Sequence, residues 1–280
     1  MRILHGKSAL VTGAASGIGR ALALRLAAEG MRLYLLDVDE AGLTRVVDEC
    51  RPLGVEAIGR RCDLAQRVEI SAAVAAILDR WGRIDLLVNN AGITYYGRTV
   101  EMTAEHWDRL LAVNLHAPVQ LVRELLPSFL AQGEAHILNV GSVCGLVGLA
   151  RVAAYSTSKF AMVGFSESLR SEYSHCGLGV TVVCPGFVDT NLFATAPLGP
   201  DRKCHKIPPR WLMTTPETIA ARAVRGIRRN RGVVVVQPYA HVMVGLKRFA
   251  PWALEGLNRL RRKRSLPGGA PVAAPDRRAA

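Results

Sequence analysis

Short runs of apolar residues alternate along the chain with longer segments whose apolar positions recur at helical spacing. The short runs have the length and composition of strands and lie at residues 8–12, 32–36, 55–61, 86–89, 136–140, 180–184 and 232–236. The longer segments have the period of amphipathic helices and lie at residues 18–29, 40–50, 67–81, 104–131, 154–175 and 216–230. Continuous apolar strands are typical of a parallel sheet that helices cover on both faces. The pattern therefore predicts an α/β fold with a doubly wound parallel sheet of about seven strands.

The length and composition suit one such Rossmann-type domain, because half of the 280 residues are hydrophobic. We expect a dinucleotide-binding and catalytic domain over residues 1–240, with a substrate lid at about 191–215, a basic amphipathic C-terminal extension at 241–266 and a disordered tail at 267–280. No apolar run is long enough to span a membrane, and the N-terminus lacks the apolar core of a secretory signal. The six cysteines have neither disulfide nor metal-ligand spacing. These features predict a cytoplasmic protein without a metal site.

A glycine-rich turn lies where the first strand passes into the first helix. Gly13, Gly17 and Gly19 let the backbone turn tightly and approach a pyrophosphate, which the free N–H groups of a helix N-terminus attract. Asp37 ends the second strand, where a carboxylate can bond the ribose hydroxyls of adenosine. The same carboxylate repels a 2′-phosphate, and Val38 offers no basic partner for one. The turn therefore predicts a dinucleotide site that prefers NAD over NADP.

Tyr155 and Lys159 share one face of a predicted helix, because they are four residues apart. An ammonium beside a phenol favours the phenolate and lowers a pKa that starts near ~10. Such a shift makes a tyrosine useful as a general acid or base near neutral pH. Ser142 lies thirteen residues before the tyrosine, and its hydroxyl can hold a carbonyl or alcohol oxygen for that proton transfer. Taken alone, a Tyr-x-x-x-Lys pattern favours the surface of an ordinary helix, because it occurs by chance in many proteins.

These elements together resemble the short-chain dehydrogenase/reductase family over roughly residues 6–240. The resemblance rests on the glycine run at 12–19, on Cys-Asp-Leu at 62–64, on Asn-Asn-Ala-Gly at 89–92 and on Pro-Gly with a following Thr at 185–190. It implies a dehydrogenase or reductase that acts on CH–OH groups with NAD(P). The residues that it assigns to the dinucleotide are Gly13, Ser16, Gly17, Ile18, Gly19, Asp37, Asp63, Leu64, Asn90, Ala91, Gly92, Tyr155, Lys159, Pro185, Gly186, Val188 and Thr190.

Asn114, Ser142, Tyr155 and Lys159 have the order and spacing of the family's catalytic tetrad. The resemblance implies that Tyr155 gives a proton to a carbonyl oxygen, or takes it from an alcohol, and that Lys159 lowers the tyrosine pKa and bonds the nicotinamide ribose. Ser142 would orient the substrate oxygen. Asn114 would hold a water that links Lys159 to solvent. The segment 188–190 would hold the nicotinamide carboxamide.

The residues expected around the substrate are apolar. Leu192, Phe193 and Trp211 belong to the expected lid, and Tyr95 and Phe187 are expected nearby. A pocket of this kind favours a hydrophobic, lipid-like or steroid-like secondary alcohol or ketone. A non-catalytic dinucleotide-binding regulatory or scaffold protein is the alternative, because a fold does not fix a function.

The net charge of +13 is concentrated near the C-terminus, where residues 201–280 hold 18 Lys and Arg against 4 Asp and Glu. Residues 245–264 combine these charges with an apolar stripe. Three interpretations stay open: a helix packed on the pocket or subunit interface, peripheral binding to an anionic membrane surface, or nucleic-acid binding. The last is disfavoured because no nucleic-acid reading motif accompanies the charge. The family resemblance also implies a homodimer or homotetramer, paired through residues 104–131 and 154–175.

Overall fold

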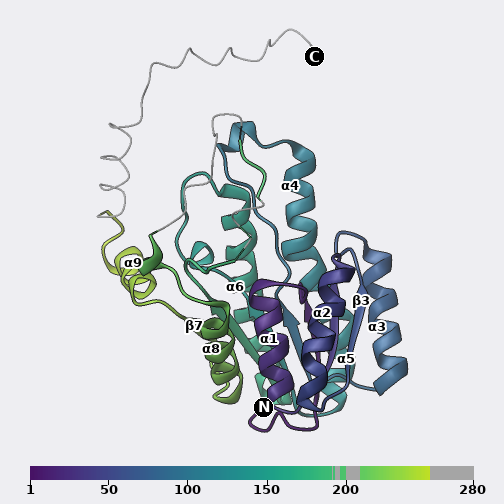
Figure 1. Ribbon diagram of the computed structural model, residues 1–280. Coiled ribbons are helices and arrows are strands. Elements are labelled where there is room, and N and C mark those ends of the chain that lie inside the picture. Colours follow the sequence, from purple (N-terminus) through teal and green to yellow (C-terminus); the bar gives the residue numbers. More distant parts are fainter. Residues whose placement is uncertain (191, 193–195, 200–208, 253–280) are drawn as a thin grey trace, which may run out of the picture.

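The centre of the fold is a seven-stranded parallel sheet with the order β3-β2-β1-β4-β5-β6-β7 (Figure 1). The computed structural model describes residues 1–190, 192, 196–199 and 209–252. Its strands are β1 (Ser8–Thr12), β2 (Arg32–Asp37), β3 (Ala57–Arg61), β4 (Leu86–Asn89), β5 (Ala135–Val140), β6 (Leu178–Cys184) and β7 (Val233–Val235). The strand order reverses between β1 and β4, and such a point opens a crevice at the carboxyl ends of the strands. The predicted Rossmann-type sheet is confirmed.

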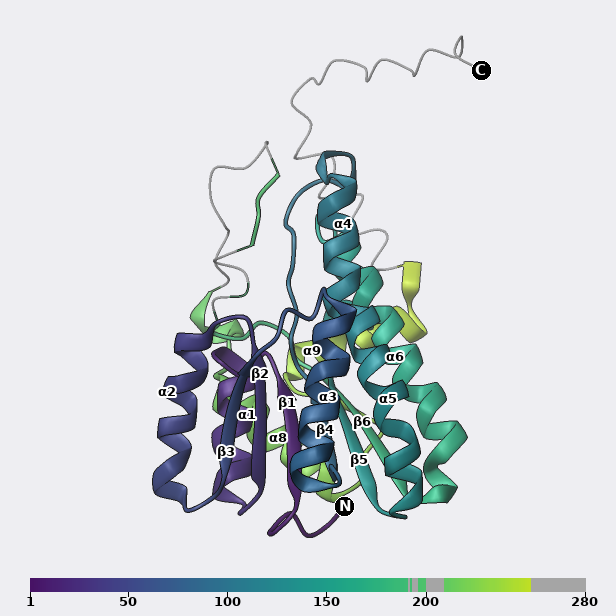
Figure 2. The same cartoon turned by 90° about the vertical axis from the view of Figure 1, so that its right-hand side faces the viewer.

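Helices cover both faces of the sheet (Figure 2). One face carries α1 (Gly17–Ala28), α2 (Glu40–Cys50) and α8 (Pro216–Arg228), and the other carries α3 (Arg67–Trp81), α5 (Ala117–Ala131) and α6 (Ala153–Tyr173). Helix α4 (Ala104–Leu111) leads into α5 through a π-helical segment, Ala112–His116. Helix α9 (Pro238–Phe249) follows β7 at the edge of the sheet. Within the described ranges, none of the helices is both long enough and apolar enough to cross a membrane.

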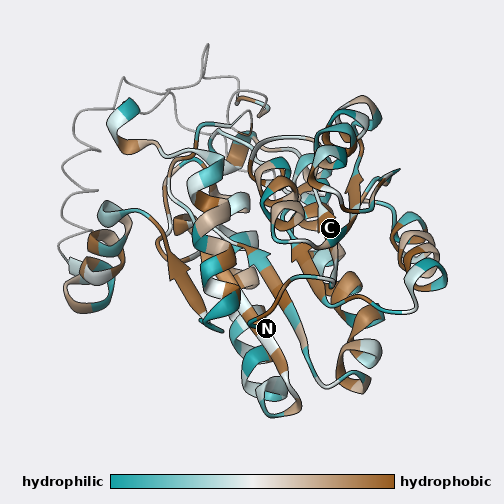
Figure 3. Ribbon diagram, turned by 60° about the horizontal axis from the view of Figure 1, so that its bottom comes forward, coloured by the Kyte–Doolittle hydropathy of each residue, from teal (hydrophilic) through white to brown (hydrophobic). Residues whose placement is uncertain are grey.

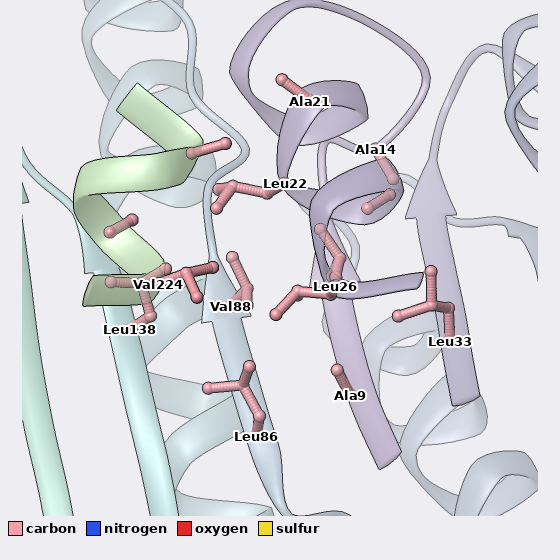
Figure 4. Packing of buried hydrophobic residues seen from close by; sticks show 14 of the residues in the cluster. Ala9, Ala14, Ala21, Leu22, Leu26, Leu33, Leu86, Val88, Leu138 and Val224 are labelled. Atoms are coloured by element: carbon pink, nitrogen blue, oxygen red, sulfur yellow. The ribbon is translucent and has the colours of Figure 1, made fainter. Parts of the chain in front are cut away.

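Each face of the sheet has its own apolar cluster, which explains why most strand positions are apolar (Figure 3). Ala9 of β1 packs with Leu22 and Leu26 of α1 and with Val224 of α8 on one face (Figure 4). The next residue, Leu10, belongs to the cluster on the opposite face. Successive side chains of a strand point to opposite faces, so a strand covered on both sides needs apolar residues at every position.

The structure corrects the sequence-based elements in three places. The single helix expected over 104–131 is interrupted by the π-helical segment Ala112–His116, and the strand expected at 55–61 begins at Ala57. The C-terminal extension expected at 241–266 begins earlier, because its first helix, α9, starts at Pro238. The part of this extension after Trp252, the tail at 267–280 and part of the lid fall outside the described residues.

Candidate active site

A cavity of about 660 Å³ lies at the carboxyl ends of the strands and brings together most of the predicted site residues. It extends from the glycine turn and the ends of β2 and β3, past the loop after β4, to the ends of β5 and β6. Of the predicted residues, Gly19 and Asn114 do not line it. The predicted residues that do line it are Gly13, Ser16, Gly17, Ile18, Asp37, Asp63, Leu64, Asn90, Ala91, Gly92, Ser142, Tyr155, Lys159, Pro185, Gly186, Val188 and Thr190.

Gly13 and Gly17 of the glycine turn line the cavity, and the turn is packed too closely to hold side chains at its glycines. A Cβ on Gly19 would lie 1.9 Å from the Gly13 carbonyl oxygen, and a Cβ on Gly13 would lie 2.7 Å from the Ala91 Cα. The Asn90 side chain holds the turn by donating to the Thr12 and Gly13 carbonyls at 2.9 and 3.0 Å. Ser16 makes no side-chain cap at the start of α1. The first N–H groups of this helix thus receive no side-chain acceptor from the capping residue, which suits the binding of a pyrophosphate.

Two carboxylates line the cavity beyond the turn. Asp37 accepts hydrogen bonds from the Ala15 N–H at 3.0 Å and the Asp39 N–H at 3.1 Å, one on each oxygen. A carboxylate oxygen has more than one lone pair, so Asp37 can also accept from a ribose hydroxyl. Asp63 forms an ion pair with Arg109 of α4 at 3.5 Å. Arg109 lines the cavity, and the sequence offered no signal for its place there.

Ser142, Tyr155 and Lys159 meet at one part of the cavity wall. Ser142 follows the end of β5, and Tyr155 and Lys159 lie one turn apart near the start of α6. Ser142 and Tyr155 share a side-chain hydrogen bond. The Lys159 Nζ lies 5.6 Å from the centre of the Tyr155 ring and donates to the Val140 carbonyl at 2.8 Å. All three residues are buried. The predicted pairing of the tyrosine and the lysine on one helix face is therefore present.

The pKa values of this pair correct one expectation. Burial raises the pKa of Tyr155, and the hydrogen bond with Ser142 offsets only part of that rise. Burial also lowers the pKa of Lys159 to about 8. The sequence predicted a lowered tyrosine pKa, but the removal of the phenol from water is the largest effect and raises it. At neutral pH the structure therefore places a neutral phenol, which can donate a proton, beside a cationic lysine.

Asn114 lies behind the cavity wall in the π-helical segment Ala112–His116. Its side chain accepts from the Ile93 N–H at 2.8 Å and donates to the Ile93 carbonyl at 2.9 Å and to the Ser158 Oγ at 3.1 Å. Both N–H groups of the Asn114 amide therefore already have acceptors within the protein. Such π-bulges inside helices occur frequently at functional sites. The side chain ties the loop after β4 to α6, next to Lys159.

The part of the cavity beyond Tyr155 is mostly apolar, with Ile93, Tyr95, Leu110, Val113 and Leu192 on its wall. The Gly199 N–H donates to the Tyr96 carbonyl at 3.0 Å, and this contact ties the described part of the expected lid to the cavity rim.

Two residues expected near the substrate lie elsewhere, and a third is not described. The placement of Trp211 in the pocket is wrong, because its side chain is 81% exposed. Phe187 does not line the cavity and instead stacks on Tyr239. Phe193 falls outside the described residues. Among the residues that the structure describes, no group of three or more His, Cys, Asp or Glu is arranged to hold a metal ion.

Comparisons with known proteins agree with this geometry. A family model described as short chain dehydrogenase matches residues 7–199. A putative ketoacyl reductase of Streptomyces coelicolor is 42% identical over 189 residues, which cover 67% of this chain and 72% of the relative. The crystal structure of a short-chain dehydrogenase/reductase from Burkholderia phymatum in complex with NAD matches with a TM-score of 0.79 and 30% identity, covering 98% of this chain and 100% of that one. A short-chain dehydrogenase from Sphingobium yanoikuyae in complex with NADPH matches with a TM-score of 0.76 and 26% identity, covering 95% and 98%.

The solved neighbours thus include one complex with NAD and one with NADPH, which supports a dinucleotide site without deciding between the two cofactors. The bare glycine turn, the uncapped start of α1 and the carboxylate of Asp37 fit such a molecule. The chain belongs to the short-chain dehydrogenase/reductase family and is an NAD(P)-dependent oxidoreductase that acts on CH–OH groups.

Proposed function

We propose that the protein interconverts a hydrophobic secondary alcohol and its ketone, with Tyr155 as the general acid or base. The observation that carries the proposal is the meeting of Ser142, Tyr155 and Lys159 in one cavity, between a bare glycine turn and an apolar wall. When bound, the dinucleotide supplies or accepts the hydride.

In the direction of reduction, the neutral Tyr155 hydroxyl donates its proton to the carbonyl oxygen. Ser142 holds that oxygen and stabilises the charge that develops on it. The cationic Lys159 stabilises the phenolate that remains on Tyr155. Asn114 fixes the backbone around Lys159 through its bonds to Ile93 and Ser158. We propose that a water held at the π-helical segment links Lys159 to solvent, so that a proton from solvent can restore the Tyr155 hydroxyl.

The residues of the dinucleotide site take their roles from the same arrangement. The glycine turn with Ser16 and Ile18 would hold the pyrophosphate, Asp37 the adenosine ribose, and Asp63 with Leu64 the adenine. The loop after β4 would border the nicotinamide ribose, and residues 185–190 would hold the nicotinamide.

The substrate class is proposed from the apolar wall and from the name of the Streptomyces relative, ketoacyl reductase. An apolar pocket with few polar groups binds the body of a hydrophobic ligand and orients it through those groups. A panel of hydroxysteroids and long-chain secondary alcohols, the corresponding ketones, and ketoacyl thioesters, followed through nicotinamide absorbance, tests this class. Turnover of sugars or small polar alcohols in preference to every hydrophobic member would contradict it.

We propose NAD as the preferred dinucleotide because Asp37 offers its carboxylate where a 2′-phosphate would lie. Asp37→Asn removes the charge and keeps the side-chain shape. We expect the ratio of kcat/KM for NAD over NADP to fall by at least about tenfold, because charged hydrogen bonds contribute about 1.5–3 kcal/mol. Steady-state kinetics with both cofactors measure the ratio. The matched control is Asp48→Asn on the exposed side of α2, which should leave the ratio unchanged. An unchanged ratio in Asp37→Asn would remove the proposed role of this carboxylate.

We further propose that the protein associates peripherally with anionic membranes through the surface around α9. Phe249 and Trp252 are 81% and 74% exposed there, next to Lys247 and Arg248. A groove of about 240 Å³ between α8, β7 and α9 adds further positive charge. This groove is lined by Arg222, Arg225, Gly226, Arg229, Arg231, Val233, Val234, Val235 and His241. Exposed aromatic residues with basic neighbours along the chain, on a protein with further surface arginines, match an anionic lipid surface.

Vesicle flotation of the full chain tests the membrane proposal. We expect the protein to float with vesicles of phosphatidylcholine and phosphatidylglycerol, and much less with phosphatidylcholine alone, because the attraction to the headgroups is electrostatic. The double variant Phe249→Ser with Trp252→Ser should float less than the wild type. Val68→Ser is the control, since Val68 is 78% exposed on α3. Equal flotation of the wild type and the double variant would contradict the proposal.

We also propose a homodimer or homotetramer that pairs through α4, α5 and α6, the helices of residues 104–131 and 154–175. The outer side of α6 presents Phe160, which is 38% exposed, and Gly164, where an added Cβ would meet no atom within 4 Å. A close approach of two helices uses such small residues. Light scattering should give a mass of two or four chains, and a mass of one chain would contradict the proposal.

A further inference from the structure

We propose that Gln237 and Tyr239, at the start of α9, are positioning residues that hold the loop Pro185–Thr190 in the geometry needed for hydride transfer. The inference rests on the function proposed above, in which this loop holds the nicotinamide end of the dinucleotide. Pro185, Gly186, Val188 and Thr190 line the cavity, whereas Gln237 and Tyr239 contact the loop from behind its wall.

Gln237 binds the loop with both ends of its side-chain amide. Its Oε1 accepts from the Gly186 N–H at 2.7 Å, and its Nε2 donates to the Phe187 carbonyl at 3.1 Å. The side chain is only 6% exposed. Gln237 occupies the N-cap position of α9, but its side chain does not cap the helix. The amide therefore binds the loop and not the first N–H groups of α9.

Tyr239 adds a second attachment one residue further along the loop. Its hydroxyl oxygen accepts from the Phe187 N–H at 2.7 Å, and its ring stacks on the Phe187 ring at 6.3 Å between centres. A Cβ on Gly186 would lie 1.9 Å from the Tyr239 hydroxyl oxygen. Any side chain at position 186 would therefore clash with Tyr239. Tyr239 also packs against the cluster that contains Tyr155 and Val143.

Backbone contacts hold the loop at its two ends. The Val143 N–H donates to the Pro185 carbonyl at 2.8 Å, and the Asp189 N–H donates to the Thr214 carbonyl at 2.9 Å. Gln237 and Tyr239 bind the middle of the loop, where the Thr214 N–H also donates to the Phe187 carbonyl at 3.1 Å. Losing the Gln237 amide would leave the Gly186 N–H without its acceptor, which favours a shifted loop. A misplacement of about 1 Å at a reacting centre can lower a rate about 100-fold.

The inference predicts a specific defect. A loosened loop should still allow the adenosine end to bind, because that end lies at the glycine turn and Asp37, on the other side of the cavity. The nicotinamide end should bind less firmly and present both ring faces. The defect should therefore appear in kcat and in the stereochemistry of hydride transfer, and not in the binding of ADP-ribose.

The test uses the full chain with Gln237→Leu, Gln237→Glu and Tyr239→Phe, and Val242→Ala as a control. Val242 lies on the same helix and is 61% exposed. Calorimetry gives the Kd of NADH and of ADP-ribose, kinetics give kcat on a ketone from the panel, and mass spectrometry follows deuterium from (4R)- and (4S)-labelled NADH. We expect Gln237→Leu to lower kcat about 10- to 100-fold and to transfer deuterium from both faces, with the Kd of ADP-ribose unchanged. Gln237→Glu keeps the acceptor for Gly186 but replaces the donor to the Phe187 carbonyl with a second oxygen, and it should show a defect of the same kind.

Tyr239→Phe covers the case in which Gln237→Leu fails to fold, because it keeps the ring stack and removes only the hydroxyl. Wild-type kcat and single-face transfer in all three variants would overturn the inference. An equal loss of NADH and ADP-ribose binding would also overturn it, since that pattern indicates a general loss of structure. If the wild type itself binds NADH but turns over no ketone, the proposed function fails, independently of these variants.

Discussion

Replacing Tyr155 with phenylalanine should lower kcat by about 100- to 10,000-fold, the range typical of losing a positioned general acid or base. The substitution removes the hydroxyl that bonds Ser142 and leaves the buried ring beside Lys159. The Kd of NADH should change by less than about threefold, because the glycine turn and Asp37 lie elsewhere in the cavity. Steady-state kinetics and a fluorescence titration with NADH measure the two quantities on the same preparation.

The matched control is Tyr173→Phe, which makes the same substitution at the far end of α6. Tyr173 packs in the cluster on one face of the sheet and not in the cavity. This variant should keep wild-type turnover. Turnover of Tyr155→Phe at the control rate would exclude Tyr155 as the acid or base.

Lys159→Met should abolish measurable turnover and at the same time make the fold more stable. Burial lowers the pKa of Lys159 from 10.5 to about 8, which corresponds to about 3 kcal/mol of penalty on the charged form in the folded protein. Methionine has a similar length and no charge, but it loses the bond to the Val140 carbonyl, at a cost of about 1 kcal/mol. We expect the free energy of unfolding at pH 7 to rise by about 2 kcal/mol, measured by urea unfolding. A functional group retained at the expense of stability is a common feature of active sites.

The pH dependence checks the cause of this stabilisation. The unfolded chain keeps its lysine proton up to about pH 10.5, whereas folded Lys159 loses its proton near pH 8. The unfolded state therefore binds more protons between these values, and wild-type stability gains with rising pH. The advantage of Lys159→Met should shrink from pH 8 towards 10. The control Lys247→Met loses an exposed hydrogen bond to the Leu146 carbonyl, so its stability should fall by about 1 kcal/mol, and this difference should not change between pH 8 and 10. A Lys159→Met protein less stable than the wild type at pH 7 would show that the charge is well compensated in the folded state.

The sheet could be predicted from the sequence because burial on both faces makes most positions of its inner strands apolar. Leu10 and Ala9 pack in opposite clusters, and the same requirement recurs along the sheet. The glycine turn could also be predicted, because a Cβ on Gly19 would lie 1.9 Å from the Gly13 carbonyl oxygen and no side chain fits there. Steric requirements of this kind act at one position, so they restrict the residue type there and can be recognised in the sequence.

The remaining parts of the site depend on contacts between distant segments. Asn114 binds Ile93 across twenty-one positions, and Gln237 binds Gly186 across fifty-one, and neither spacing follows any local period. The direction of the Tyr155 pKa also depends on how deeply the whole fold buries the hydroxyl. A Tyr-x-x-x-Lys pattern indicates a shared helix face, but it carries no information about the depth of burial.

The most direct test of the central claim is to incubate the purified chain with deuterium-labelled NADH and each ketone of the hydrophobic panel, and to analyse the products by mass spectrometry. The account predicts an alcohol with one deuterium on its carbinol carbon, formed by the wild type and lost in Tyr155→Phe. If the chain binds NADH but forms no deuterated alcohol from any ketone, the account is contradicted. The alternative of a non-catalytic dinucleotide-binding protein would then be favoured.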